Sequence, residues 1–229
     1  MSDILWTITL TLVVYLMFFY IQKKTKLMIL NPLFFTSVFI IIFLVIFKID
    51  YNVYKEGSSF ITFLIGPATV SLAIPLYEKL PLLKKHYKTI LLTITTGVLS
   101  HAIIIGFMAF VLNISHELIA TFIPKSVTTP IAKEISLALG GIEELTIAIV
   151  IITGIFGSII APYIFKILKV ESSIAIGLSL GISAHAIGTS KAIELGEEEA
   201  SMSTLALILT GILTVVLSPL FYKIIVSIT

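Results

Sequence analysis

Long apolar runs separated by short polar joints organise this chain. Eight apolar segments lie at about 4–22, 29–47, 58–78, 88–112, 117–139, 143–168, 173–195 and 200–228. Several approach the roughly 20 apolar residues that a helix needs to cross a bilayer. The ten-residue alternation typical of a membrane barrel is missing from the sequence. The pattern therefore predicts an all-α polytopic membrane protein with about 6–8 membrane segments.

Composition supports this class and narrows the function. The 229 residues are 58% hydrophobic and 12% charged, whereas soluble domains carry about 25% charged residues. We expect one membrane domain over 1–229, because no joint is long enough to hold a soluble domain. The net charge is only +2 and no basic arm occurs, so nucleic acid is not an expected partner. There is no cysteine, which excludes disulfides and thiolate metal sites.

A polar, helix-breaking element recurs inside two of the apolar segments. The run Ser126-Val127-Thr128-Thr129-Pro130 is followed 57 residues later by Ser183-Ala184-His185-Ala186-Ile187-Gly188-Thr189. Proline and clustered hydroxyl residues are poorly suited to a continuous lipid-facing helix. We therefore expect segments 117–139 and 173–195 to be broken helices, which either re-enter the membrane or cross it.

Other features keep the same 57-residue offset. Thr153-Gly154-Ile155 returns as Thr210-Gly211-Ile212, and Pro162 returns as Pro219. Chance matches in an Ile- and Leu-rich chain are the alternative, but three separate features at one offset favour a duplication. The predicted divisions are N-terminal scaffold helices at 1–57, a faint first repeat at 58–112, and repeats with a broken element at 115–170 and 172–229.

The lysines suggest how the repeats are oriented. Basic joints occur at Lys23-Lys24-Lys26, at Lys79 to Lys88 and at Lys166 with Lys169. The positive-inside rule assigns basic joints to the cytoplasmic side. All three fit that side only if segment 117–139 does not cross completely. The sequence thus predicts an outside N-terminus and an inverted repeat, as in many transporters.

The two polar breaks form the candidate binding site. A broken helix leaves unpaired backbone groups that water, other helices or a ligand must satisfy. Helix N-termini at the breaks also favour anions such as carboxylates. The predicted substrate-binding residues are Lys125, Ser126, Thr128, Thr129, Ser183, His185 and Thr189. Capping and packing of the helices is the alternative role for each hydroxyl taken alone.

Two ionisable residues in this set are predicted to bind a proton or to attract the substrate. His185 at the second break can exchange a proton near neutral pH, which would couple transport to protons; a hydrogen-bonded packing role is the alternative. Lys125 would attract an organic anion, or else extend to the membrane interface. His101 is interpreted as a packing residue. The pairs Lys133/Glu134 and Lys191/Glu194 are interpreted as terminal charges or salt bridges.

Motifs for catalysis, metal binding or cofactor binding are missing from the sequence. The four histidines show no i, i+4 spacing with another ligand. A glycine-rich phosphate loop and a nucleophile elbow are also missing. We therefore predict neither an enzyme nor a metal or cofactor site.

The chain resembles the LrgB/CidB family of bacterial inner-membrane proteins, including its YohK-like branch. The resemblance is carried by Pro124 to Ala132 with Gly140-Gly141-Ile142, and by Ser183 to Thr189. It extends nearly from end to end. The C-terminal half of the plastid glycolate/glycerate translocator is similar as well.

The resemblance implies two alternative functions. One is a secondary transporter of a small monocarboxylate such as pyruvate, lactate or glycolate, coupled to protons. The other is an antiholin-like or holin-like regulator of murein hydrolase activity and cell lysis, without transport of its own. It also implies a multi-pass protein of the bacterial inner membrane with a small LrgA/CidA-like membrane partner. A homo-oligomer, with a dimer as the simplest case, is expected from other transporters.

Overall fold

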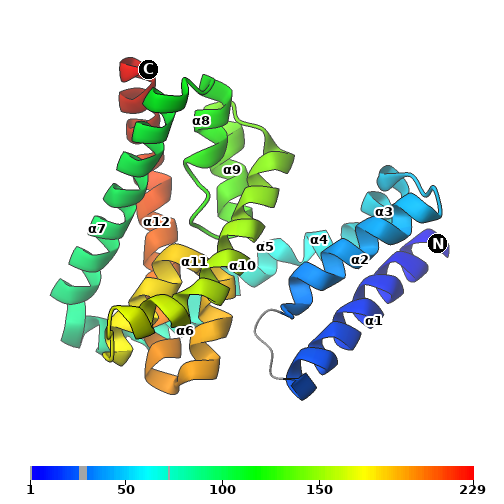
Figure 1. Ribbon diagram of the computed structural model, residues 1–229, viewed down its shortest axis with the longest axis horizontal. Helices are drawn as coiled ribbons and strands as arrows, with labels where there is room; N and C mark the ends of the chain where they lie inside the picture. The colour runs from blue at the N-terminus through cyan, green and yellow to red at the C-terminus, as the bar shows by residue number, and fades with distance from the viewer. Residues whose placement is uncertain (1, 26–29, 72) are drawn as a thin grey trace. The chain divides into compact units, whose positions relative to one another are not determined.

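The computed structural model describes residues 2–25, 30–71 and 73–229, and these residues are almost entirely helical (Figure 1). Lys26 of the first basic joint lies outside these ranges. The helices are α1 (Ser2–Thr25), α2 (Pro32–Ile46), α3 (Tyr51–Gly57), α4 (Ser59–Phe63), α5 (Ile65–Ser71), α6 (Ala73–Glu78), α7 (Leu80–Leu112), α8 (His116–Phe122), α9 (Thr129–Leu139), α10 (Glu143–Ile167), α11 (Ser173–Leu195) and α12 (Glu197–Ile228).

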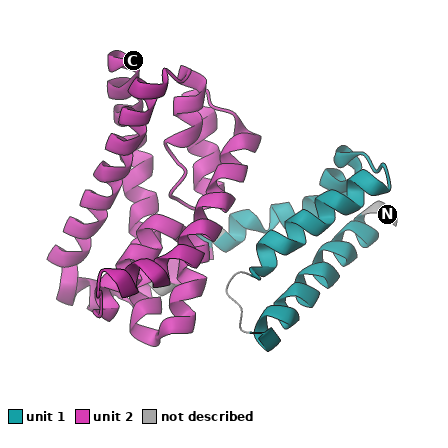
Figure 2. Ribbon diagram, viewed as in Figure 1, with its two compact units in different colours: residues 1–70 teal, residues 71–229 magenta. Residues whose placement is uncertain are grey.

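The chain divides into two compact units, Met1–Val70 and Ser71–Thr229 (Figure 2). The first unit is built on the packed pair α1 and α2. Asn31 caps α2, because its side-chain oxygen accepts hydrogen bonds from the backbone N–H groups of Leu33 and Phe34. Aromatic contacts such as Phe18 against Phe35, with ring centroids 5.6 Å apart, hold the two helices together. The predicted subdivision of the chain into repeats stays a prediction.

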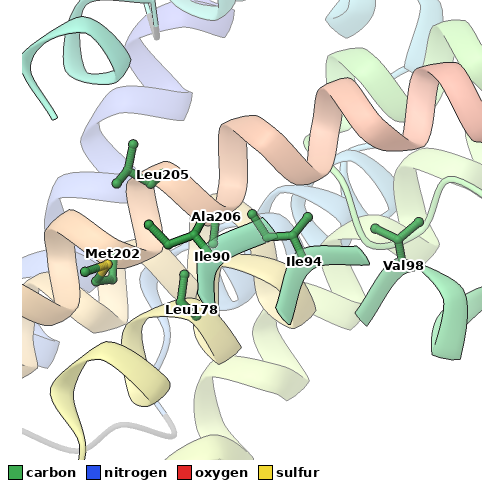
Figure 3. Close-up of a cluster of buried hydrophobic side chains, with 7 residues drawn as sticks. All are labelled: Ile90, Ile94, Val98, Leu178, Met202, Leu205 and Ala206. Atoms are coloured by element: carbon green, nitrogen blue, oxygen red, sulfur yellow. The ribbon is translucent and has the colours of Figure 1, made fainter. Parts of the chain in front are cut away.

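The second unit has its apolar core between α7, α11 and α12. Ile90, Ile94 and Val98 recur every four residues and therefore lie on one face of α7. Figure 3 shows this row facing a group of side chains from the other two helices, which are Leu178, Met202, Leu205 and Ala206. The core joins segments that are far apart in the sequence, and it positions α7 beside the second broken helix.

Among the residues that the structure describes, five helices are long and apolar enough to cross a membrane: α1, α7, α10, α11 and α12. Two shorter apolar helical stretches lie at Pro32–Ile46 and Ser59–Ala68. The apolar segment at 58–78 is divided among the short helices α4, α5 and α6, and it contains Pro67 and Pro75. The all-α polytopic membrane class predicted from the sequence is confirmed.

Candidate functional site

The first predicted break lies between α8 and α9. Helix α8 ends at Phe122 and α9 begins at Thr129, with a non-helical connection at 123–128. Thr128 is the N-cap residue of α9, and Pro130 follows in the first turn, where a proline is tolerated. The Thr128 side chain does not cap the helix, and its buried hydroxyl finds no hydrogen-bond partner among the described residues. The predicted interruption of segment 117–139 is confirmed.

The second break lies inside α11, at His185. This residue has φ 41° and ψ −130°, which interrupts the helical backbone. A Cβ atom at Gly188 would overlap the carbonyl oxygen of Leu180. Residues eight apart in a straight helix are separated by about 12 Å along the axis, so α11 bends sharply here. The predicted break in segment 173–195 is therefore confirmed, although no proline lies in that segment.

His185 is fixed at this bend by hydrogen bonds to its neighbours. Its Nε2 lies 3.0 Å from the carbonyl oxygen of Val150 on α10. A carbonyl only accepts, so Nε2 carries the hydrogen, and Nδ1 is buried without a partner in the part of the chain that the structure describes. The Thr189 hydroxyl donates to the His185 carbonyl at 3.0 Å and pairs with the Ser203 hydroxyl at 2.9 Å.

The repeated glycines contact the broken helices in a reciprocal manner. Gly154 of α10 faces the second break, where an added Cβ would lie 2.7 Å from the His185 ring and 2.8 Å from Ile187. Gly211 of α12 faces the first broken element, where an added Cβ would lie 2.9 Å from Ile131. Helix α10 therefore contacts the second broken helix and α12 contacts the first, while α12 also packs along α11. Contacts of this kind are expected of an inverted repeat, and both the repeat and its inversion stay predictions.

These two glycines should respond differently to alanine. Gly154→Ala is expected to lower the stability of the protein by about 1–3 kcal/mol, because the ring that it displaces is held by the Val150 carbonyl. Gly211→Ala should have a much smaller effect, because only the flexible end of Ile131 must move. Thermal unfolding of both purified variants in detergent measures the difference. Equal losses would contradict the tight fit at His185.

A cavity of about 260 Å³ lies beside the first break and is lined by α7, α11, α12 and the connection at 123–128. Its wall is mainly apolar. Polar side chains reach it from all four elements, and these are Ser100, His101, Lys125, Ser126, Ser183, Thr210 and Thr214. The volume is below the roughly 300–1,000 Å³ of pockets for drug-sized ligands. The cavity thus fits a small molecule with few polar groups.

The structure separates the predicted site residues into two groups. Lys125, Ser126 and Ser183 line the cavity. The other four, which are Thr128, Thr129, His185 and Thr189, lie at or next to the breaks and do not line it. The two predicted polar runs therefore meet at one cavity through Ser126 and Ser183, and Lys125, which directly precedes the first run, lines the same cavity.

Sequence reasoning missed the wall contributed by α7 and α12. His101, interpreted as a packing residue, is hydrogen-bonded through Nε2 to the Ile123 carbonyl at 3.0 Å, and it also lines the cavity. Its Nδ1 lies 3.5 Å from the Ser126 hydroxyl. Thr210 and Thr214 are one helical turn apart on α12, a polar stripe on an apolar helix that a periodicity search could have found.

The remaining charged pairs lie outside the cavity. Lys191 pairs with Glu194 at 2.6 Å, which confirms the predicted salt bridge. Lys133 pairs at 2.8 Å with Glu143, at the start of α10, so its observed ion pair is not with the adjacent Glu134. Lys125 takes part in no ion pair among the described residues. Within the same residues, no three His, Asp or Glu side chains are grouped as metal ligands would be.

These features define a polytopic α-helical membrane protein with two broken helices beside a small cavity. The chain belongs to the LrgB-like family, whose model matches residues 11–224. It is 37% identical over 213 residues to the uncharacterized protein YxaC of Bacillus subtilis, covering 93% of each chain. It is also 36% identical over 219 residues to the holin-like protein CidB of Staphylococcus aureus, covering 94% of this chain and 96% of CidB. No solved structure gives a significant match.

Proposed function

We propose that this protein is a secondary transporter of a small monocarboxylate such as pyruvate, lactate or glycolate. One observation carries the proposal: Lys125 lines a small cavity in a membrane protein and has no acidic partner among the described residues. A charged side chain in a membrane segment is costly and usually has a partner or faces a cavity. A carboxylate bound beside Lys125 would supply the missing negative charge.

The other polar side chains suit a carboxylate with one further polar group. Ser126 and Ser183 reach the cavity from the two broken elements, and Thr210 reaches it from α12. The Thr210 hydroxyl oxygen is buried and has no hydrogen-bond partner among the described residues, so a ligand oxygen or a water can pair with it. A single cation matches a single carboxylate better than a dicarboxylate. The apolar remainder of the wall excludes larger polar molecules.

The broken helices provide a mechanism for alternating access. In many transporters, broken helices near the midplane form the site and move against the other helices. Here the cavity is bounded by residues of both broken elements, at Ser126 and Ser183. Thr128, Thr129 and Thr189 would support the backbone at the breaks, and the predicted proton coupling by His185 would act from the same region. The proposal includes a bacterial inner-membrane location with the N-terminus outside.

Uptake into proteoliposomes tests this function. Purified protein should take up labelled pyruvate, lactate or glycolate saturably, and faster when the interior is alkaline. Thr128→Ala should slow uptake, because it removes a buried hydroxyl at the first break that has no hydrogen-bond partner among the described residues and is therefore free to pair with water or a ligand as the helices move. The absence of saturable uptake of any of the three acids would contradict the proposed function, and normal rates in Thr128→Ala would contradict a role for the first break in transport.

A holin-like role is the second candidate, because the similar Staphylococcus aureus protein is named as holin-like. It would act through oligomers, with a small CidA-like membrane protein as partner. A pore of this kind would release an entrapped fluorescent dye and would not saturate with any acid. Dye release at the rate of carboxylate entry would therefore favour this candidate over transport.

A further inference from the structure

His101 joins the first broken element to the cavity. Its Nε2 donates to the Ile123 carbonyl at 3.0 Å, since a carbonyl only accepts. In the neutral ring, Nδ1 then keeps its lone pair, and it lies 3.5 Å from the hydroxyl of Ser126. His101 and Ser126 both line the cavity. The ring can therefore accept a proton at Nδ1 while its bond to the backbone stays in place.

One charged group faces His101 across this cavity. That group is Lys125, and it interacts electrostatically with His101. From α11 the cavity receives Ile182 and Ser183, and from α12 it receives Thr210, Thr214 and Phe221, none of which titrates. Two positive charges that line the same cavity repel each other. A carboxylate bound beside Lys125 would remove that repulsion and favour a proton on His101.

We propose that His101 is the proton-binding group of this cavity and takes up a proton when a carboxylate binds beside Lys125. The proton comes from water, adds to Nδ1 and forms an imidazolium, so the anion and the proton enter the site together. This inference rests on the anion site of the proposed function. It assigns to His101 the coupling role that the sequence suggested for His185.

The position of His185 makes it the competing candidate. Its ring does not line the cavity, and its Nδ1 is enclosed at the bend of α11 without a partner among the described residues. Lys125 interacts electrostatically with His185 too. An anion in the cavity would therefore stabilise a proton on His185 less than a proton on His101.

Calorimetry of pyruvate binding tests the inference without requiring transport. The full-length protein in nanodiscs is titrated near neutral pH in two buffers of different ionisation enthalpy, which gives the number of protons taken up per bound anion. His101→Gln removes the titrating group and keeps an N–H donor near the Ile123 carbonyl. His185→Gln tests the competitor. His116→Gln is the matched control, because His116 is exposed at the start of α8.

We expect proton uptake with pyruvate in the wild type, in His116→Gln and in His185→Gln, and its loss in His101→Gln, which should still bind pyruvate. Proton uptake that persists in His101→Gln, disappears in His185→Gln or is missing from the wild type would overturn the inference. Coupled binding by a protein that transports nothing would refute the proposed function and leave the inference standing. A wild type that binds no acid would overturn both.

A second readout needs no substitution at His101. With nitrogen-15 histidine, pyruvate should move one imidazole signal of the four histidines towards the protonated position. That signal should be present in His185→Gln and in His116→Gln. A signal that moves only when His185 is intact would contradict the assignment, even if His101→Gln does not fold.

Discussion

Lys125→Met is expected to reduce carboxylate uptake at low substrate concentration by about tenfold to 100-fold. Methionine keeps most of the apolar stem of the side chain and removes the positive charge. Hydrogen bonds to charged groups contribute about 1.5–3 kcal/mol, and each 1.4 kcal/mol changes an affinity about tenfold. Because Lys125 forms no ion pair with the described residues, its loss leaves no buried acid without a partner. The effect should therefore fall on binding, with folding preserved.

Lys133→Met is the matched control for this charge. Lys133 lies on α9, follows the same break and pairs with Glu143 at the protein surface. Exposed ion pairs contribute about 0–1 kcal/mol, so uptake should stay close to the wild-type rate. Initial rates over a range of pyruvate concentrations measure both variants. Equal rates for the two variants would show that the cavity lysine does not bind the anion.

Gly188→Ala is expected to be among the most destabilising small substitutions in the second unit. Its Cβ would overlap the Leu180 carbonyl and lie 2.7 Å from the Ala184 Cβ, so the bend of α11 must open. Overpacking of this kind costs about 1–3 kcal/mol or more. Opening the bend would also move Ser183 and His185, which lie just before Gly188 in the sequence. We therefore expect a lower melting temperature in detergent together with a loss of uptake.

Gly66→Ala provides the comparison for that change. Gly66 lies in α5, and a Cβ there would meet no atom within 4 Å. Alanine is favoured over glycine in a helix by about 0.5–1 kcal/mol, whereas Pro67, the next residue, disfavours a helical backbone at a preceding residue that carries a Cβ. Because these two effects oppose each other and no other atom is displaced, the variant should lose much less stability than Gly188→Ala. Similar melting temperatures for Gly188→Ala and Gly66→Ala would rule out the sharp bend of α11 at His185.

The sequence predicted the helical membrane class and both interruptions. The break after Phe122 follows from Pro124 and Pro130, which disfavour a continuous helix. The break at His185 has no proline, and only the 57-residue repeat located it. Local propensity would have missed this bend, because its cause is close packing of Gly188 against the preceding half of α11. The repeat was therefore more informative than the local signal.

The cavity could be predicted only in part. Ser126 and Ser183 belong to polar runs that stand out in apolar surroundings, and Lys125 directly precedes the first run, so sequence reasoning found all three. His101 and Thr210 were missed as wall residues because they occupy continuous helices, and the sequence does not say that α7 and α12 meet beside the first break. That contact depends on long-range packing such as the row from Ile90 to Val98 against α11 and α12.

Counterflow of labelled pyruvate shows whether the protein is a carrier with one alternating site. Proteoliposomes loaded with unlabelled pyruvate are diluted into a trace of labelled pyruvate without a pH gradient. A carrier with one alternating site gives a transient accumulation of label above equilibrium, because each inward turn is matched by an outward turn with unlabelled substrate. The proposed function predicts this overshoot for wild-type protein and its loss in Lys125→Met. A smooth approach to equilibrium by the wild type, without overshoot, would contradict the transporter.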